Sequence, residues 1–245
     1  MKSIQFPRPI ISLHQLEITS RCNLRCVYCP SPSIVAGKYP NRPAGDMSRE
    51  LFLRSLEWVK AFVAAGTQRE LNLAGIGEST MHPDFVDFVR LAREAVGPVV
   101  KIIFATNGLI HDEAMVRAIA PYSPQVFVSL HRPEKAGRAI EVYRKYGLLA
   151  GASADPSISP NSWAGQVDWI DSGQRMRCQW LQDGKAMVMA DGRITVCCLD
   201  ASGAGVIGHV RDEIGTARSK PFNLCTGCYQ DIGSDTWDQK RGVPK

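Results

Sequence analysis

The sequence lacks the long apolar runs and the signal peptide that direct a chain into or across a membrane. No stretch of about 18 apolar residues occurs. Pro7 and Pro9 interrupt the N-terminal segment where a signal peptide would carry its apolar core. A strong charge imbalance is also missing, because 29 Lys and Arg face 24 Asp and Glu, a net charge of +5. We therefore expect a cytoplasmic protein that binds neither membranes nor nucleic acid.

Cysteine is absent from the 148 residues between Cys29 and Cys178. The eight cysteines of the 245-residue chain instead form two dense groups. The first group is Cys22, Cys26 and Cys29, and the second is Cys178, Cys197, Cys198, Cys225 and Cys228. A disulfide framework rarely leaves so long a bare stretch, and a cytoplasmic chain keeps its thiols reduced. The spacing therefore favours two separate metal sites.

Short apolar strands alternate with amphipathic helices between the two cysteine groups. Strands are predicted over 16–19, 71–74, 101–105, 126–128 and 148–152. A long loop rich in Pro, Ser and Gly is predicted over 30–46. Helices are predicted from Ser48, a suitable N-cap, to about Gly66, and over 85–92, 112–120 and 134–146. This alternation predicts right-handed βαβ units and a parallel sheet. We expect an α/β barrel domain over residues 1–155.

The pattern changes in the C-terminal part of the chain. Residues 186–190 and 194–196 flank Asp191-Gly192, which predicts a β-hairpin. A short helix is expected over about 211–219. These features indicate a small domain over 156–232, of the kind that bound metal holds together, followed by an irregular tail over 233–245.

Polar motifs follow directly on four of the predicted strands. They are the first cysteine loop, Gly75-Ile-Gly77-Glu78-Ser79, Thr106-Asn107-Gly108 and Ser129-Leu-His131. The carboxyl ends of parallel strands meet at one face of an α/β barrel, where ligands bind. Each motif alone is also what an ordinary turn contains. Four at equivalent positions predict one shared site.

The first cysteine group has its own chemical logic. Three thiolates from one short loop leave one iron of a four-iron cluster open to a ligand. Structural zinc, the alternative, would need a fourth donor such as His14. The residues Cys22-Asn-Leu-Arg-Cys26-Val-Tyr28-Cys29 resemble the C-x3-C-x-aromatic-C signature of the radical S-adenosylmethionine (SAM) family, with Tyr28 at the aromatic position.

The resemblance covers residues 10–150 and implies the fold and chemistry of that family. The implied fold is a partial (β/α)6 barrel of the TIM type. Cys22, Cys26 and Cys29 would carry a [4Fe-4S] cluster that binds SAM. Members of the family cleave SAM to methionine and a 5′-deoxyadenosyl radical, which takes a hydrogen atom from the substrate.

The same resemblance assigns SAM contacts to the motifs at the other strand ends. Gly75, Gly77 and Glu78 resemble a motif that holds the methionine amino group, and a carboxylate suits an ammonium ligand. Ser79 departs from that motif, which more often has proline. Asn107 and Ser129 lie where relatives contact the SAM carboxylate or ribose. Each of these residues also has a purely structural alternative. Gly77 and Glu78 could form a plain turn with a solvated acid, Asn107 an Asn-Gly turn, and Ser129 a hydroxyl at the end of a strand.

The second cysteine group resembles the twitch domain, a shortened SPASM domain appended to radical SAM enzymes. Gly192-x4-Cys197, Gly208 and the C-x2-C at 225–228 carry this resemblance. It implies an auxiliary [4Fe-4S] cluster on Cys178, Cys197, Cys225 and Cys228, which would relay electrons without an open iron. A four-cysteine zinc site is the alternative. Cys198 is then a structural thiol, an alternative ligand or a hydrogen-atom donor.

The whole chain resembles small twitch-containing enzymes of the 2-deoxy-scyllo-inosamine dehydrogenase type. This implies dehydrogenation of an alcohol in a small sugar- or cyclitol-like molecule, with the auxiliary cluster as electron acceptor and flavodoxin or ferredoxin as external donor. Trp163 falls where that dehydrogenase has a basic substrate-binding residue, so a different substrate is expected. His131 is a candidate base or substrate contact, or simply a packed residue. Arg132 and Asp155 are further candidate contacts.

Two other functions stay open. SPASM and twitch enzymes also mature ribosomal peptides by epimerisation or by thioether or carbon–carbon crosslinks. The short segment before the first strand argues against a peptide-recognition domain, and epimerisation would need a thiol such as Cys198. A non-catalytic zinc or electron-transfer protein would leave Glu78 and the strand-end motifs without a purpose.

Overall fold

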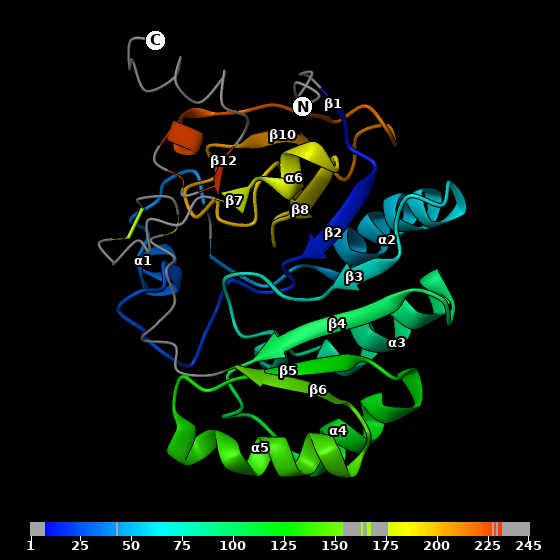
Figure 1. Ribbon diagram of the computed structural model, residues 1–245, viewed down its shortest axis with the longest axis vertical. Helices are drawn as coiled ribbons and strands as arrows, with labels where there is room; N and C mark the ends of the chain where they lie inside the picture. The colour runs from blue at the N-terminus through cyan, green and yellow to red at the C-terminus, as the bar shows by residue number, and fades with distance from the viewer. Residues whose placement is uncertain are drawn as a thin grey trace.

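One eight-stranded sheet organises most of the chain in the computed structural model, which describes residues 8–42, 44–153, 163, 166–167, 176–226, 228 and 230–231 (Figure 1). The strands are β2 (Ser12–Leu16), β3 (Glu70–Asn72), β4 (Lys101–Thr106), β5 (Gln125–Ser129), β6 (Leu149–Ser153), β8 (Lys185–Val188), β9 (Arg193–Thr195) and β10 (Val206–His209). Their order is β10-β9-β8-β2-β3-β4-β5-β6. Strands β8 to β6 of that order pair in parallel, and β9 and β10 are antiparallel. The predicted parallel α/β sheet is confirmed, as an open sheet.

Four longer helices connect the parallel strands and pack with them into one hydrophobic core. They are α2 (Arg49–Ala64), α3 (Phe85–Val96), α4 (Glu113–Ile119) and α5 (Pro133–Lys145). The Ser48 hydroxyl accepts the Leu51 N–H at 3.2 Å, which confirms the predicted N-cap of α2. Among the helices that the structure describes, none has the length and apolar composition needed to span a bilayer.

The C-terminal hairpin of β8 and β9 belongs to the same sheet as the parallel strands β2 to β6. Strand β8 pairs in parallel with β2, and Gly192 makes the turn to β9 with φ 86°. Val188 and Val210 lie in the main core, and the Trp58 indole of α2 donates to the Val210 carbonyl at 3.0 Å. Sheet and core therefore extend across residue 155. The predicted domain boundaries stay a prediction.

Three local expectations differ from the structure. The first strand occupies Ser12–Leu16 rather than 16–19, and a short helix, α1 (Ser31–Val35), interrupts the predicted loop over 30–46. Pro32 occupies the first turn of α1, where a missing N–H costs nothing. The helix predicted over 211–219 is wrong. Gly215, with φ 87°, forms a turn there instead, and β11 (Arg218–Ser219) follows and pairs with β1 (Arg8–Pro9).

The remaining short elements surround the second cysteine group. They are β7 (Met176–Arg177), which pairs in parallel with β12 (Gln230–Asp231), and α6 (Gln179–Gln182). Single 3-10 turns occur at Ser79–Met81, Ala120–Tyr122 and Asn223–Thr226. Asp155 and the tail over 233–245 lie outside the described residues.

Candidate functional site

The predicted motifs come together at the carboxyl ends of β2, β3 and β4. The Asn107 backbone N–H donates to Glu78 Oε2 at 2.7 Å, which joins the loops after β3 and β4. The Asn107 side chain donates to Asn23 Oδ1 at 2.7 Å and to Cys22 Sγ at 3.7 Å. Asn107 thus links the first cysteine loop to the buried carboxylate of Glu78. In Figure 1 these strands end on the same side of the sheet.

The first cysteine loop has the donor chemistry that an iron–sulfur cluster uses. Backbone N–H groups donate to two of the sulfurs, from Leu24 to Cys22 at 3.4 Å and from Ser31 to Cys29 at 3.5 Å. Burial raises the pKa of the Cys29 thiol to about 12, and the nearby thiols of Cys22 and Cys26 add to that rise. N–H···S bonds stabilise the thiolates that ligate clusters and tune their potential. The loop therefore fits a cluster of this kind.

The thiols of Cys22 and Cys26 lie close enough to Cys29 to affect its pKa, but the three are not arranged around one metal position. In the part of the chain that the structure describes, no three His, Cys, Asp or Glu side chains are arranged to hold a metal ion. The three cysteines lie half-buried in one loop.

Two glycines of the loop after β3 are required by the close approach of β2. A Cβ on Gly75 would lie 2.4 Å from Glu17 Cγ, and one on Gly77 would lie 2.3 Å from the Thr19 carbonyl oxygen. The Glu78 N–H donates to the Arg21 carbonyl at 2.8 Å. A side chain at either glycine would push this loop away from the cysteine loop. The glycines therefore fix the distance between the two loops.

Glu78 is buried and held by the protein on both oxygens. Its Oε1 accepts the Thr80 hydroxyl at 2.7 Å, and its Oε2 accepts the Asn107 N–H. Burial raises the pKa of the Glu78 carboxyl, and the hydrogen bonds from Asn107 and Thr80 oppose that rise. The carboxylate is thus rigidly placed, with only 3% of Glu78 exposed.

Tyr28 and His131 form a direct pair across the site. Tyr28 Oη lies 2.6 Å from His131 Nδ1, and the two ring centroids are 5.8 Å apart. Burial lowers the pKa of His131, which favours the neutral imidazole at pH 7. Ser129 ends β5 half-buried, and its carbonyl accepts the His131 N–H at 2.8 Å. The loop after β5 therefore joins the site through His131.

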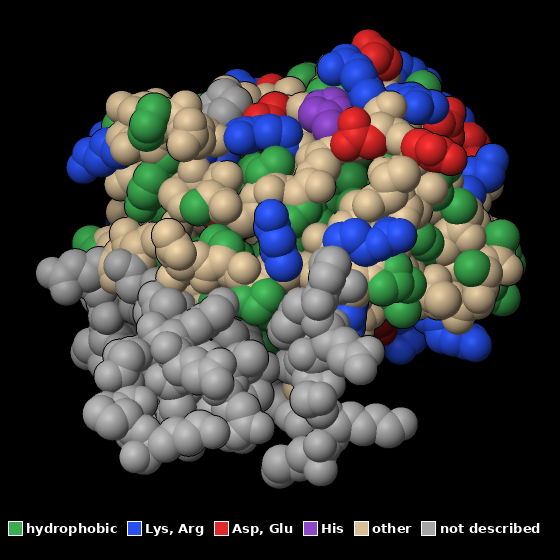
Figure 2. All heavy atoms as spheres, turned by 90° about the horizontal axis from the view of Figure 1, so that it is seen from above, with side chains coloured by type: hydrophobic (Ala, Val, Ile, Leu, Met, Phe, Trp, Pro, Cys, Tyr) green, Lys and Arg blue, Asp and Glu red, His purple; other side chains and the backbone are tan. Residues whose placement is uncertain are grey.

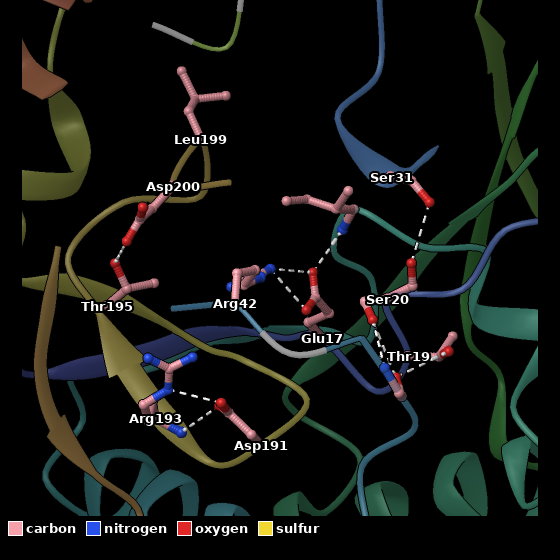
Figure 3. Close-up of polar contacts among 12 residues, drawn as sticks. Glu17, Thr19, Ser20, Ser31, Arg42, Asp191, Arg193, Thr195, Leu199 and Asp200 are labelled. Atoms are coloured by element: carbon pink, nitrogen blue, oxygen red, sulfur yellow. Dashed lines mark hydrogen bonds and ion pairs between the residues drawn. The ribbon is translucent and has the colours of Figure 1, made fainter. Parts of the chain in front are cut away.

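A buried ion pair that the sequence analysis missed lies beside these loops. Arg42 Nη2 donates to both Glu17 oxygens, at 2.8 and 2.7 Å, and each side chain is 1% exposed (Figure 3). Glu17 Oε2 also accepts the Ile76 N–H at 2.9 Å, from the loop after β3. Nε and Nη1 of Arg42 are buried without a hydrogen-bond partner in the described structure. The pair ties the end of β2 to the Gly75–Glu78 loop.

The other three predicted ligands of the second group lie in the two apolar clusters that Cys197 contacts. Cys178 and Cys197 pack against the apolar cluster of Leu181, Val196 and Cys225, while Cys197 and Cys198 pack against Leu199 and Cys228. Burial raises the pKa of Cys197 well above its usual value, and nearby Cys198, Cys228 and Cys178 add to the rise. The Leu199 N–H donates to Cys197 Sγ at 3.3 Å. These thiols have the donor type that an iron–sulfur cluster uses, and they share two adjoining apolar clusters.

The loop that follows Cys198 is fixed by a buried carboxylate. Asp200 Oδ2 accepts the Thr195 hydroxyl and the Gly205 N–H, both at 2.8 Å, and Oδ1 accepts the Ala204 N–H at 3.0 Å. Figure 3 shows Asp200 turned toward Thr195, at the end of β9. The fully occupied carboxylate has a structural role, which is to hold the turn that carries Cys197.

Trp163 lies between the two cysteine groups. It packs with Cys29, Ile34, Ile76 and Ala201 in one apolar cluster. It also packs with Leu199, Cys228 and both Cys197 and Cys198 in another. The sequence analysis listed Trp163 only as a substrate contact. The structure adds that this side chain connects the surroundings of the two groups.

Comparison with known protein families supports the interpretation of the first group. The family model of the radical SAM superfamily matches residues 16–148. That range contains the cysteine loop and the motifs after β3, β4 and β5.

Three curated relatives differ in how much of their length is matched. The chain is 35% identical over 108 residues to a Pyrococcus furiosus tungsten-containing aldehyde ferredoxin oxidoreductase cofactor-modifying protein, and 38% over 91 residues to the PqqA peptide cyclase of Ruegeria pomeroyi. These matches cover 43% and 36% of this chain but only 26% and 21% of the relatives. A Niallia circulans S-adenosyl-L-methionine-dependent 2-deoxy-scyllo-inosamine dehydrogenase is 22% identical, over 83% of this chain and 80% of that protein.

Solved structures share the fold over most of the chain. The structure of BtrN in complex with AdoMet and 2-DOIA matches with a TM-score of 0.66 and 19% identity, over 82% of this chain and 78% of that one. The structure of anSMEcpe with bound AdoMet and Cp18Cys peptide matches with a TM-score of 0.56 and 17% identity, over 83% and 78%. At these identities the likeness concerns the fold.

Proposed function

Because the chain belongs to the radical SAM superfamily, we propose that it is a dehydrogenase that oxidises an alcohol carbon of a small, polar, sugar- or cyclitol-like molecule. Cys22, Cys26 and Cys29 would hold the first [4Fe-4S] cluster, and Cys178, Cys197, Cys225 and Cys228 the second. SAM and the first cluster, when bound, supply the radical that removes a hydrogen atom. An external flavodoxin or ferredoxin would supply the initiating electron.

The protein residues of the site would bind SAM and take up the substrate proton. The rigid loop of Gly75, Gly77 and Glu78 presents a carboxylate suited to an ammonium group. Asn107 lies beside this loop and donates a hydrogen bond to Cys22 Sγ. His131 Nε2 would accept the hydroxyl proton. This needs the tautomer in which Nδ1–H donates to the Tyr28 oxygen, a choice that the 2.6 Å contact permits.

The proposed oxidation balances with the groups named. The substrate hydroxyl would lose its proton to His131, and the hydrogen atom on its carbon would go to the radical that bound SAM supplies. A second cluster held by Cys178, Cys197, Cys225 and Cys228 would supply the acceptor for the one electron that remains when the carbonyl forms. The observation that carries this proposal is that the thiols of the second group share two apolar clusters joined by Cys197. Trp163 packs against one of these clusters and also against the cluster that Cys29 contacts.

Iron content and SAM cleavage test the proposal. After anaerobic reconstitution we expect about eight irons per chain, and about four in a Cys26→Ala variant, because each cluster holds four. Reductant-dependent 5′-deoxyadenosine should form only when Cys22, Cys26 and Cys29 are intact. Stoichiometric zinc in place of iron, or 5′-deoxyadenosine from the Cys26→Ala variant, would contradict it.

Deuterium transfer tests the substrate class. Cyclitols and sugars deuterated at their carbinol carbons should pass deuterium to 5′-deoxyadenosine and yield a ketone. Transfer from a peptide substrate, without a carbonyl product, would support the second candidate instead.

Peptide maturation is that second candidate, because the PqqA peptide cyclase is 38% identical over 91 residues. In that case Cys198, packed beside Leu199 and Cys228, would serve as the hydrogen-atom donor of an epimerase. A Cys198→Ala variant separates the dehydrogenase from an epimerase, and the deuterium experiment above separates it from a crosslinking enzyme. A dehydrogenase keeps full turnover in this variant, whereas an epimerase that uses this thiol loses it.

A further inference from the structure

The first cysteine loop exposes alternate residues along its length. Arg21, Asn23, Arg25 and Val27 are exposed, whereas Cys22, Leu24 and Cys26 between them are half-buried. Val27 is 74% exposed, so most of this apolar side chain faces solvent. The residues on either side of Cys26 therefore form part of the molecular surface directly above a proposed cluster ligand.

The charged residues of the segment that carries the first cysteine group are all positive. Residues 21–45 contain Arg21, Arg25, Lys38 and Arg42 and no Asp or Glu. Arg42 is buried against Glu17, and Arg21 is paired with Asp46. Arg25 and Lys38 are exposed and have no ion pair within the described residues. Two uncompensated positive charges thus remain on the segment that carries the cysteines.

On the face of the molecule seen in Figure 2, several Lys and Arg side chains lie next to Asp and Glu. An exposed ion pair of this kind joins Arg211 to Glu50. Charges of both signs cancel at short range and give little steering of a charged partner. In the segment over 21–45, by contrast, Arg25 and Lys38 form no ion pair within the described residues, and the apolar Val27 is exposed as well.

We propose that Arg25, Val27 and Lys38, here called the loop face, form the docking surface for an acidic electron-carrier protein. The inference rests on the proposed function, which requires an electron from outside. Transient electron-transfer complexes are small and are guided by complementary charge. The exposed valine, two residues from Arg25 in the sequence, supplies a short apolar contact, and its neighbour Cys26 is a proposed cluster ligand.

Charge reversal tests the loop face with a matched control. The probe is flavodoxin, and its dissociation constant for the reconstituted holoenzyme is measured by flavin fluorescence at low ionic strength. We expect Arg25→Glu combined with Lys38→Glu to raise this constant about tenfold and to flatten its dependence on salt. Lys60→Glu, the same change on the exposed side of α2, should leave it unchanged.

The apolar contact has its own pair of variants. Val27→Asp should weaken flavodoxin binding, because it adds a like charge and removes the apolar group. Val99→Asp is the control, since Val99 is 82% exposed on the turn before β4, away from the cysteine loop in sequence and fold. Both variants should fold and take up the same amount of iron as the parent.

Comparison with dithionite separates this inference from the proposed function. Dithionite reduces the protein without docking, so the loop-face variants should cleave SAM at the parental rate with dithionite and several-fold more slowly with reduced flavodoxin. Unchanged flavodoxin binding and rate would overturn the docking surface and leave the proposed function intact. Equal losses with both reductants would assign these residues to the site itself and also overturn it. No SAM cleavage by the parent with dithionite would overturn both.

Discussion

The two cysteine groups are set in different surroundings, and the difference indicates different tasks. The first lies in a half-buried loop held by polar contacts, namely the Asn107 amide on Cys22 and the nearby Glu17–Arg42 pair. The second is enclosed by apolar side chains, with Cys225 and Cys228 buried. An accessible site with fixed polar groups suits ligand binding, and an enclosed one suits electron storage. The predictions below test this contrast, from the largest effect to the smallest.

The largest effect is expected at neighbouring cysteines of the second group. Cys197→Ser should remove about four irons from the reconstituted protein, because it deletes a proposed ligand of the proposed second cluster. Cys198→Ser should keep the full iron content. Iron assay together with visible absorption measures both. If iron binding instead needs Cys198 and not Cys197, the proposed ligand assignment is wrong and Cys198 is the ligand.

Arg42→Met tests the polar framework of the first region. It leaves the Glu17 carboxylate buried and unpaired, which should lower the free energy of unfolding by about 3–5 kcal/mol in anaerobic urea denaturation. The matched control is Arg138→Met, which breaks an exposed pair with Glu141 and should cost less than about 1 kcal/mol.

A second variant distinguishes the loss of the ion pair from general misfolding of Arg42→Met. Glu17→Gln combined with Arg42→Met removes both charges and should recover part of the lost stability, because no unpaired ion remains. A loss of less than about 1 kcal/mol in Arg42→Met would show that this pair does not support the region.

His131→Gln tests the proton chemistry of the first region. Turnover should fall about 100-fold, a common contribution for a general base, while 5′-deoxyadenosine formation without substrate stays near parental. In the parent the pH profile should fall on the acid side below pH 6.5, because burial lowers the pKa of His131 and the imidazole must be neutral to accept a proton. An unchanged pH profile in His131→Gln would remove this residue from the mechanism.

Gly77→Ala should have the smallest effect of the four. Its Cβ would lie 2.3 Å from the Thr19 carbonyl, so the loop after β3 must shift and SAM affinity should fall about tenfold, close to 1.4 kcal/mol. Gly137→Ala is the control, because a Cβ on that glycine of α5 meets nothing within 4 Å. It should stabilise the protein by about 0.5–1 kcal/mol. Equal SAM affinity in both variants would show that the close approach of Gly77 to the Thr19 carbonyl is not needed for SAM binding.

Sequence patterns predicted the regular elements well where local physics determines them. The capped, amphipathic α2 and the apolar strands β4 and β5 lie within about two residues of expectation. The helix expected over 211–219 was wrong because turn-forming contacts prevail there. The Asp212 carboxylate accepts the His209 N–H at 2.7 Å, and Gly215 adopts a positive φ.

The candidate site was predictable only in part. Cysteine spacing and strand-end motifs identified the side chains that now meet through Asn107 and Glu78. Glu17 and Arg42 were missed because they are 25 residues apart, one at the end of an apolar strand and one in a proline-rich loop. No periodicity or spacing joins them, and only the folded chain shows that both are buried. The pairing of Tyr28 with His131, 103 residues away, was missed for the same reason.

The proposed contrast between an open first cluster and an enclosed second cluster is tested most directly by electron paramagnetic resonance of two variants. One replaces Cys22, Cys26 and Cys29 by Ala and keeps the second cluster, and the other replaces Cys197 by Ala and keeps the first. Each is reduced with dithionite and measured with and without SAM. We predict that SAM changes the spectrum of the Cys197→Ala variant and leaves that of the triple variant unchanged. A SAM-dependent change in the triple variant would contradict the assignment of the two groups.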